Sequence, residues 1–210
     1  MAQPVLAPDA ADALLFDLGR VVIDIDFDKV LACWAGHAGC KPADLSRAAF
    51  SQSETFRRHE TGHAGDAEFF AALRATLGIG LSDEQLLEGW NTIFTGEIPG
   101  INALLARAAK RLPLYVFSNT NPLHVAHFTR PYANVLGHFR EIFLSCAIGL
   151  RKPDAAAYDH VIKAIGVPAQ RIVFFDDLAA NIEGARKQGL TAVHVTSPND
   201  VADALSALGL

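Results

Sequence analysis

The sequence predicts a doubly wound α/β fold, in which helices cover both faces of a parallel sheet, with an all-helical insertion. Five short runs of branched and aromatic apolar residues are typical of strands buried on both faces. They lie at 13–17, 113–119, 141–145, 171–177 and 191–197. Segments of helical period lie between the later runs, and this alternation of strand and helix is the pattern of a parallel sheet.

The elements follow in a simple order along the chain. After the first strand, residues 27–95 contain Ala-, Leu- and Phe-rich stretches at helical spacing and no convincing strand. The sequence IPG at 98–100 then marks the return to the sheet. We therefore expect a catalytic core of residues 1–26 and 96–210 and a helical cap of residues 27–95. In the core, the helices expected at 155–166 and 179–189 both close on a glycine, a common C-terminal signal.

Composition excludes several functional classes. The 210 residues carry 23 acidic and 18 basic side chains, a net charge of −5, with no basic run of the kind that binds nucleic acid. No apolar stretch approaches the roughly 20 residues that a membrane helix needs. The first residues show no basic segment followed by an apolar run, so we expect a cytoplasmic protein. A monomer acting on a small molecule is the default expectation.

Polar side chains stand at the carboxyl ends of four predicted strands. They are Asp17, Ser118 with Asn119, Ser145, and the pair Asp176 and Asp177, and Lys152 follows the third strand in a short loop. Ligands of open parallel sheets bind beyond these strand ends, where the strand order reverses. One such acid means little, but several that converge at one edge indicate a site.

Charge indicates what that site holds. Three carboxylates at one edge, with only Lys152 to balance them, repel one another unless their pKa values rise or a cation lies among them. Mg²⁺ prefers oxygen ligands and is commonly shared between carboxylates and a phosphate. The Ser118 hydroxyl, backbone amides after it and the Lys152 ammonium are suited to phosphate oxygens. The set is therefore typical of phosphoryl transfer.

Four segments carry a resemblance to a known family. FDLGRVVID, VFSNTN, RKPD and FFDDLAANIEGA, in this order, resemble the four motifs of the haloacid dehalogenase superfamily, in the subgroup with a helical cap after the first strand. More narrowly, they are similar to those of bacterial glucose-1-phosphate phosphatases. The resemblance implies a Rossmann-like core and a Mg²⁺-dependent phosphatase that forms an aspartyl-phosphate intermediate. It also implies a small phosphomonoester as substrate, of the sugar phosphate class, such as glucose 1-phosphate.

The resemblance assigns the metal-binding residues by position. Asp17 matches the nucleophile and a metal ligand, the backbone carbonyl of Gly19 matches a second ligand, and Asp177 matches a third. Asp176 is expected to orient metal-bound water from beside the ligands. Asn181 either braces the metal loop or has a purely structural role.

The resemblance also assigns the phosphate-binding residues. Ser118 and Asn119 match the residues that bind the phosphate oxygens. Lys152 matches the catalytic lysine that neutralises both phosphate and nucleophile. The nearby acids Asp24 and Asp26 lie seven or more residues beyond the first strand, and we expect them to be structural or to act at the cap hinge.

The sequence departs from the family pattern at Gly19. Phosphatases of the superfamily commonly carry at this position a second Asp that transfers protons, an effect typically worth ~10²–10⁴ in rate. Either the leaving group needs little protonation, or another residue substitutes, or the protein is a metal-independent haloacid dehalogenase. The pair Asp176 and Asp177 argues for a metal and hence for a phosphatase, and the retained Asp17, Lys152 and Asp177 argue against a non-catalytic binding protein.

A polar cluster in the cap is the candidate substitute. The segment FRRHETG at 56–62 places Arg57, Arg58, His59 and Glu60 in a region otherwise rich in Ala and Leu. One hypothesis is that the cluster supplies the missing polar contacts to the site. The alternative is a solvated helix end that Gly62 terminates.

Overall fold

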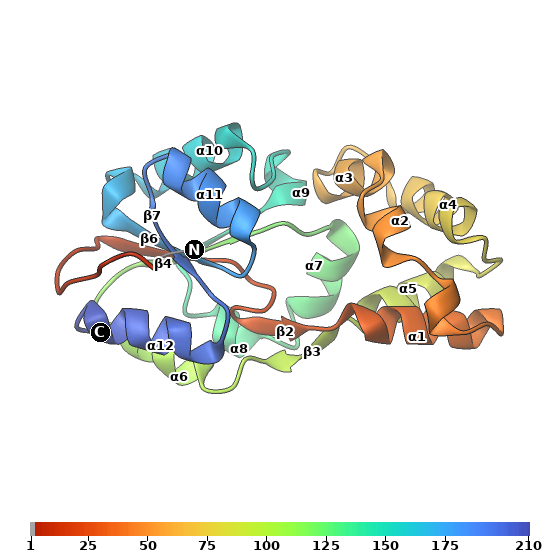
Figure 1. Cartoon of the computed structure of the whole chain (residues 1–210), viewed down its shortest axis with the longest axis horizontal. Helices are drawn as coiled ribbons and strands as arrows, with labels where there is room; N and C mark the ends of the chain where they lie inside the picture. Colours follow the sequence, from red (N-terminus) through yellow and green to blue (C-terminus); the bar gives the residue numbers. More distant parts are fainter. Residues whose placement is uncertain (1–2) are drawn as a thin grey trace.

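Five parallel strands form the sheet at the centre of the larger lobe in the computed structural model, which describes residues 3–210 (Figure 1). Their order across the sheet is β5-β4-β1-β6-β7. The strands are β1 (Ala13–Phe16), β4 (Leu114–Ser118), β5 (Glu141–Leu144), β6 (Ile172–Asp176) and β7 (Thr191–His194). Each lies within one of the five predicted runs, which confirms the doubly wound α/β class. The chain reverses its direction of travel across the sheet on either side of β1, so the switch in strand order lies there.

Helices cover both faces of this sheet, because successive side chains of each strand point to opposite faces and both sets are apolar. Leu14 and Phe16 pack on one face, and Ala13 and Leu15 pack on the other. The first face is covered mainly by α6 (Ile101–Ala108), α8 (Ala133–Leu136) and α12 (Pro198–Ala207), with α7 (Pro122–Phe128) at its edge; the second is covered by α10 (Ala155–Ile165) and α11 (Ala179–Lys187). The short α9 (Ser145–Ile148) follows β5, and a 3-10 turn η2 (Ala169–Arg171) precedes β6.

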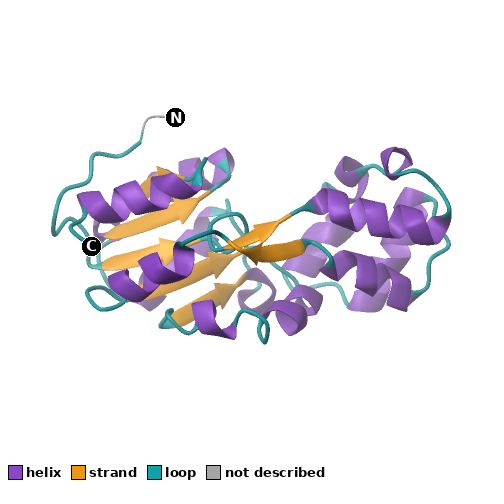
Figure 2. Ribbon diagram, turned by 90° about the horizontal axis from the view of Figure 1, so that it is seen from below, coloured by secondary structure: helices purple, strands orange, loops and turns teal. Residues whose placement is uncertain are grey.

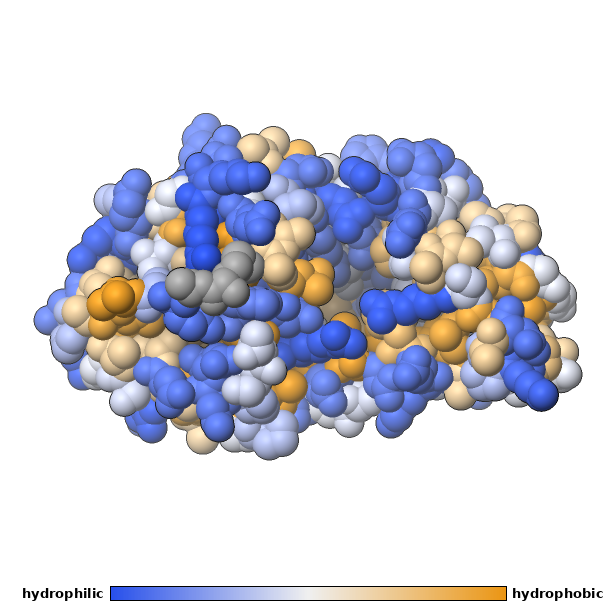
Figure 3. Space-filling view, viewed as in Figure 1, coloured by the Kyte–Doolittle hydropathy of each residue, from blue (hydrophilic) through white to orange (hydrophobic). Residues whose placement is uncertain are grey.

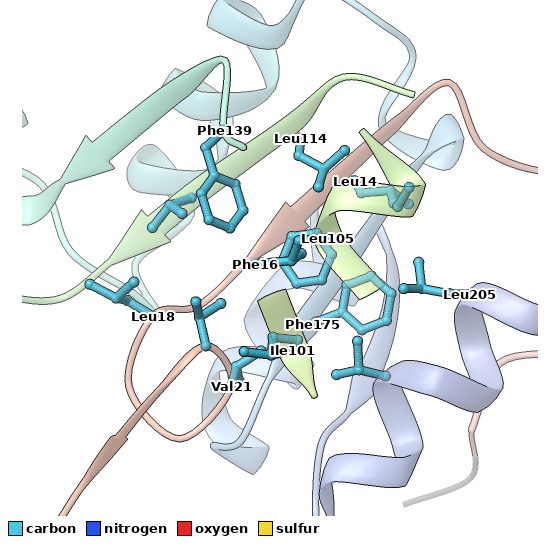
Figure 4. Close-up of a cluster of buried hydrophobic side chains, with 14 of the residues drawn as sticks. Leu14, Phe16, Leu18, Val21, Ile101, Leu105, Leu114, Phe139, Phe175 and Leu205 are labelled. Carbon is cyan, nitrogen blue, oxygen red and sulfur yellow. The ribbon is translucent and has the colours of Figure 1, made fainter. Parts of the chain in front are cut away.

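Aromatic stacking joins the two central strands directly beneath the site. Phe16 at the end of β1 stacks on Phe175 of β6, with ring centroids 4.6 Å apart and planes inclined by 7°. Figure 4 shows the pair among Leu105, Leu205 and other fully buried side chains. Because both phenylalanines directly precede acids in sequence, this packing sets the spacing of the carboxylates that follow.

Two short strands connect the core to the smaller lobe. β2 (Ile23–Ile25) and β3 (Phe94–Glu97) pair antiparallel and form the narrow bridge between the lobes in Figure 2. These strands were not predicted, because each is too short to show an alternation of apolar and polar residues. β3 runs across the expected boundary at residue 95, so the exact division of the chain into core and cap stays a prediction. Asp24 accepts a hydrogen bond from Thr95 within this bridge, a structural role.

The insertion between β1 and β3 is otherwise helical, as expected. It contains α1 (Phe27–Ala38), the 3-10 turn η1 (Pro42–Asp44), α2 (Arg47–Ser51), α3 (Glu54–Glu60), α4 (Asp66–Leu77) and α5 (Asp83–Asn91). Asp26 caps α1 by accepting a hydrogen bond from the backbone N–H of Asp28, at 2.9 Å. No helix among residues 3–210 combines the length and the apolar character that crossing a bilayer requires.

The cap has its own aromatic core, in which two tryptophans pack face to face. Trp34 of α1 and Trp90 of α5 stack with ring centroids 5.9 Å apart and planes inclined by 11°. The Trp34 indole N–H donates to the backbone oxygen of Leu86, at 3.0 Å. Gly89 makes this approach of the two helices possible, because a Cβ at that position would lie 2.3 Å from Trp34 Cδ1.

Gly89→Ala is expected to destabilise the protein by about 1–3 kcal/mol, because the added methyl group overpacks the ring of Trp34. Chemical denaturation of the two proteins measures the difference. Gly36→Ala is the matched control, since Gly36 is also helical and has no atom within 4 Å of an added Cβ. The control should be unchanged or up to about 1 kcal/mol more stable; equal destabilisation of both variants would contradict the packing argument.

Candidate active site

The carboxyl ends of β1 and β6 bring three carboxylates together. Asp17 follows β1, Asp176 ends β6 and Asp177 comes next; one carboxylate oxygen of each lies within 4.8 Å of the others. The two strands pair in parallel, and the Asp17 backbone N–H donates to the Phe175 oxygen at 2.8 Å. Adjacent parallel strands therefore produce the convergence that the sequence predicts.

Lys152 lies between two of these acids. Its ammonium Nζ is 2.8 Å from Asp17 Oδ1 and 2.7 Å from Asp176 Oδ2, and only 1% of its side chain is exposed. The rings of Phe117 and Phe174 lie 5.2 and 5.3 Å from the same Nζ. A buried ammonium needs such partners, because leaving it unpaired away from water costs several kcal/mol.

Asp176 accepts hydrogen bonds from several groups of the core. Besides Lys152, it accepts hydrogen bonds from Asn181 Nδ2, at 3.0 Å, and from the backbone N–H of Leu178, at 2.8 Å. These contacts fix Lys152 and the start of α11, and the expected role of Asp176 in orienting metal-bound water stays a prediction. Asn181 is 3% exposed and braces this loop through Asp176, in agreement with one of its two expected roles.

Asn119 also uses its side chain inside the protein. Its Oδ1 accepts from the Lys152 backbone N–H and its Nδ2 donates to the Lys152 backbone oxygen, both at 2.9 Å. The side chain of Asn119 thus holds the lysine loop, while the residue also lines the cavity, and its role in binding phosphate stays a prediction. Ser118, the last residue of β4, lines the same cavity as Asp17. It therefore lies where a residue that binds phosphate oxygens is expected.

Burial perturbs the ionisation of the site. Desolvation raises the pKa of Asp17 to about 7, against the opposing effect of Lys152. Desolvation, with a further contribution from Asp176, also raises the pKa of Asp177. Burial works against the charged form of Lys152, but the adjacent Asp17 and Asp176 outweigh it and raise its pKa. The lysine thus stays charged, while the acids at the cavity lack a full complement of positive charge.

This donor set fits a hard divalent cation such as Mg²⁺. Asp17 and Asp177 offer carboxylate oxygens at the wall of the cavity, and Gly19, whose backbone can offer a carbonyl, lines the same wall. Carboxylates and carbonyls are the ligands that Mg²⁺ takes. His194 Nε2 donates to the backbone oxygen of Asp177, at 3.0 Å, and so holds that residue in place.

A cavity of about 340 Å³ lies between the core and the cap, and Figure 3 shows its opening as a recess between the two lobes. The core contributes Asp17, Ser118, Lys152 and Asp177 to its wall. The cap contributes mostly apolar and aromatic side chains, which are Phe27, Phe56, Trp90 and Ile93, together with Arg47 and Glu60. The volume lies in the range typical of sites for small molecules.

The residues of the polar cluster in the cap have different environments, and only part of the cluster lies at the site. Arg58 pairs with Glu68 at 2.5 Å on the cap surface. His59 is buried, stacks on Phe69 at 4.2 Å and lies 2.9 Å from Asp66. Of the cluster Arg57 to Glu60, Glu60 is the residue that lines the cavity.

Several cavity residues were not identified from the sequence. Arg20 lies 3.9 Å from Asp177, and Arg47 stacks on the Phe27 ring at 3.7 Å. Arg151 lies 3.1 Å from Glu60; its position next to Lys152 in the RKPD segment was an available signal. Arg20 likewise lies in the FDLGRVVID segment, three residues after Asp17. For Arg47 no motif offered a signal, since isolated arginines on helices are ordinary surface residues.

Three carboxylates and a buried lysine at the strand ends of a Rossmann-like sheet, facing a helical cap, are the arrangement typical of a phosphoryl-transfer hydrolase. Residues 11–189 match the haloacid dehalogenase-like hydrolase family, and the chain belongs to it. It is a phosphatase of that family, a phosphoric monoester hydrolase.

Known relatives cover most of the chain. It is 27% identical over 182 residues to D-ribitol-5-phosphate phosphatase of Bacteroides thetaiotaomicron, covering 84% of this chain and 87% of the relative. It is 30% identical over 149 residues to a phosphatase of Mycobacterium tuberculosis, covering 68% of this chain and 69% of the relative. A solved enzyme of the same superfamily from B. thetaiotaomicron, in complex with magnesium and inorganic phosphate, shares the fold with a TM-score of 0.76 at 24% identity, covering 88% of this chain and 93% of that one.

These comparisons confirm the superfamily and the phosphatase class. The first relative is named for ribitol 5-phosphate, so the narrower likeness to glucose-1-phosphate phosphatases stays a prediction.

The affinity for Mg²⁺ is expected to fall about tenfold for each pH unit below pH 7, because Asp17, with its pKa of about 7, must lose a proton to bind the ion. Calorimetric titration with MgCl₂ at pH 5.5, 6.5 and 7.5 measures the slope. Asp159→Asn, which removes an exposed carboxylate from α10, should leave the slope unchanged. An affinity that does not change between pH 5.5 and 7 would contradict the prediction.

Proposed function

We propose that this phosphatase is Mg²⁺-dependent and hydrolyses small sugar or polyol phosphates, with Asp17 as the nucleophile. The observation that carries the proposal is the placement of Asp17 at the wall of the cavity between core and cap, with Lys152 Nζ at 2.8 Å and Asp177 within reach of the same cation. This is the constellation that phosphoryl transfer requires: a positioned anionic nucleophile beside concentrated positive charge.

The residues divide the reaction between them. An oxygen of Asp17 attacks phosphorus and displaces the alcohol, which gives an aspartyl phosphate, and water then attacks that phosphorus and releases phosphate. Lys152 and the Ser118 hydroxyl hold the phosphoryl oxygens. Mg²⁺, when bound by Asp17, Asp177 and the Gly19 carbonyl, supplies the positive charge that offsets repulsion between nucleophile and substrate and polarises the phosphoryl group. Asp176 and Asn181 keep Lys152 in its place.

The cavity supports a small substrate. Its volume of about 340 Å³ suits a small organic phosphate better than a protein segment or a polymer. The charged side chains of Arg20, Arg47, Glu60 and Arg151 line the same cavity as the apolar rings and are suited to the hydroxyl groups of a sugar or polyol. The ribitol-5-phosphate phosphatase relative supports the same class, and glucose 1-phosphate stays a candidate within it.

The dehalogenase alternative is weaker on chemical grounds. Displacement of halide from carbon needs no metal, yet burial and mutual repulsion raise the pKa values of both Asp17 and Asp177. A cation between these carboxylates removes that cost, which favours a metal-dependent reaction.

Purified protein is expected to release phosphate from ribitol 5-phosphate, glucose 1-phosphate or another small sugar phosphate only when Mg²⁺ is present, and Asp17→Asn should lower kcat by about 10⁴-fold or more. A phosphate-release assay over a substrate panel, with MgCl₂ or with EDTA, measures both effects. Asp24→Asn is the control, because Asp24 is exposed on β2 and pairs with Thr95. Halide release from 2-chloropropionate without metal, together with no phosphatase activity, would overturn the proposal.

A further inference from the structure

The position two residues after Asp17 carries no proton donor, because Gly19 has no side chain. A Cβ placed on Gly19 would lie 2.9 Å from Cδ1 of Ile25, so an apolar side chain fills the space next to this backbone. The alcohol that leaves phosphorus must nevertheless gain a proton, unless it is a stable anion. The proton must therefore come from another wall of the cavity.

Glu60 is the carboxyl group on that other wall. Among the described residues that line the cavity, the acids are Asp17, Asp177 and Glu60, and the first two belong to the metal site. Glu60 is 9% exposed, and its Oε2 is buried with no hydrogen-bond partner. Arg151 Nη2 forms an ion pair with that oxygen at 3.1 Å, without hydrogen-bond geometry. A carboxylate buried at the wall of a cavity, with an ion-pair partner but with one oxygen that accepts no hydrogen bond, is costly to keep for structural reasons alone.

Glu60 is fixed to the core although it belongs to the cap. Ser145, at the start of α9, donates its hydroxyl to the Glu60 backbone oxygen at 2.6 Å and accepts from the Thr120 N–H at 2.9 Å. Gly62 has φ +72°, and a Cβ there would lie 2.4 Å from the Cys146 oxygen, so only glycine permits this approach. Figure 1 shows α3 beside α9 accordingly. The Glu60 backbone is thus joined through one hydroxyl group to the loop that follows Ser118.

The other titratable side chains of the cavity are poor proton donors. His124 donates its Nε2–H to the Trp90 backbone oxygen, at 3.2 Å, and its Nδ1 faces Asn121 at 3.1 Å, so neither nitrogen is free. Burial lowers the pKa of His124 to about 3, which keeps it neutral. Lys152 is paired with Asp17 and Asp176. The arginines stay protonated throughout.

We propose that Glu60 is the general acid and base of the reaction and substitutes for the acid missing at Gly19. The inference rests on the proposed function. As the Asp17 oxygen bonds to phosphorus and the phosphorus–oxygen bond to the leaving group breaks, the Glu60 carboxyl gives its proton to that oxygen and the alcohol leaves. Glu60, now a carboxylate, then takes a proton from the water that attacks the aspartyl phosphate. Phosphate leaves, and Asp17 and the Glu60 acid are restored.

The charges around Glu60 suit both roles. Desolvation raises the pKa of Glu60 to about 7, against the opposing effects of Arg151, Lys152 and Arg57. Cys146 faces it from α9, and burial raises the pKa of that thiol, so it adds no charge near neutral pH. A group with a pKa near the working pH is protonated often enough to donate and deprotonated often enough to accept.

Glu60→Gln tests the proposal through the leaving group. For the sugar or polyol phosphate that the wild type hydrolyses best, kcat/KM should fall by ~10²–10⁴-fold, because an alkoxide cannot leave unprotonated. For p-nitrophenyl phosphate, whose leaving group is a stable anion, kcat/KM should change by less than about threefold. With that ester, slow hydrolysis of the intermediate should produce a burst of p-nitrophenol equal to the enzyme concentration.

Glu54→Gln is the matched control. It removes an exposed carboxylate from the first turn of the same helix α3, and it should leave kcat/KM for both esters unchanged. Thermal denaturation establishes that both variants fold. Equal losses on the two esters, or no loss on either, would overturn the role of Glu60. A wild-type protein without phosphatase activity, or an Asp17→Asn variant that keeps it, would instead overturn the proposed function on which the inference rests.

Discussion

The pairing of the buried Lys152 ammonium with Asp17 and Asp176 is the interaction on which the rest of the site depends. Strands β1 and β6 deliver both acids into a region with almost no water, where each charge alone is expensive. One lysine offsets two carboxylates and sets their separation, and Asn119 holds the backbone of that lysine with two hydrogen bonds. The stack of Phe16 on Phe175 fixes the two strands behind them. The negative charges of Asp17 and Asp177 are only partly offset, by Lys152 and Arg20. This excess of negative charge favours a bound cation.

The two lobes contribute different chemistry. The core provides charge and hydrogen-bonding groups at strand ends, where the backbone is rigid. The cap provides mostly rings and aliphatic side chains, with Trp90 both in its own core and at the cavity wall. A site made in this way keeps the phosphoryl end constant and lets the enclosing wall set which organic group fits. Arg47 and Glu60 are the polar exceptions on the cap side, which is why they are informative about substrate and mechanism.

The sequence predicts the core well because its signals are local. Buried parallel strands are continuous apolar runs, so all five were located to within three residues, and the polar side chains at their ends identified the site edge. The bridge of β2 and β3 was missed because three or four residues carry no periodicity. The hydrogen bonds between the Asn119 side chain and the Lys152 backbone were not predicted, because the two residues lie 33 positions apart along the chain. Within the cluster Arg57 to Glu60, only the packing of α3 on α9 decides which side chain faces the cavity.

The contacts of Ser145 have a consequence for the cost of separating cap and core. Its hydroxyl donates to the Glu60 backbone oxygen of the cap at 2.6 Å and accepts from the Thr120 N–H of the core, and the Thr120 backbone oxygen lies 3.0 Å away as a second acceptor. If the cap moved away, the hydroxyl could turn to Thr120, and no buried donor would be left without a partner. The two lobes can therefore part at this point without the penalty of an unmade hydroxyl hydrogen bond.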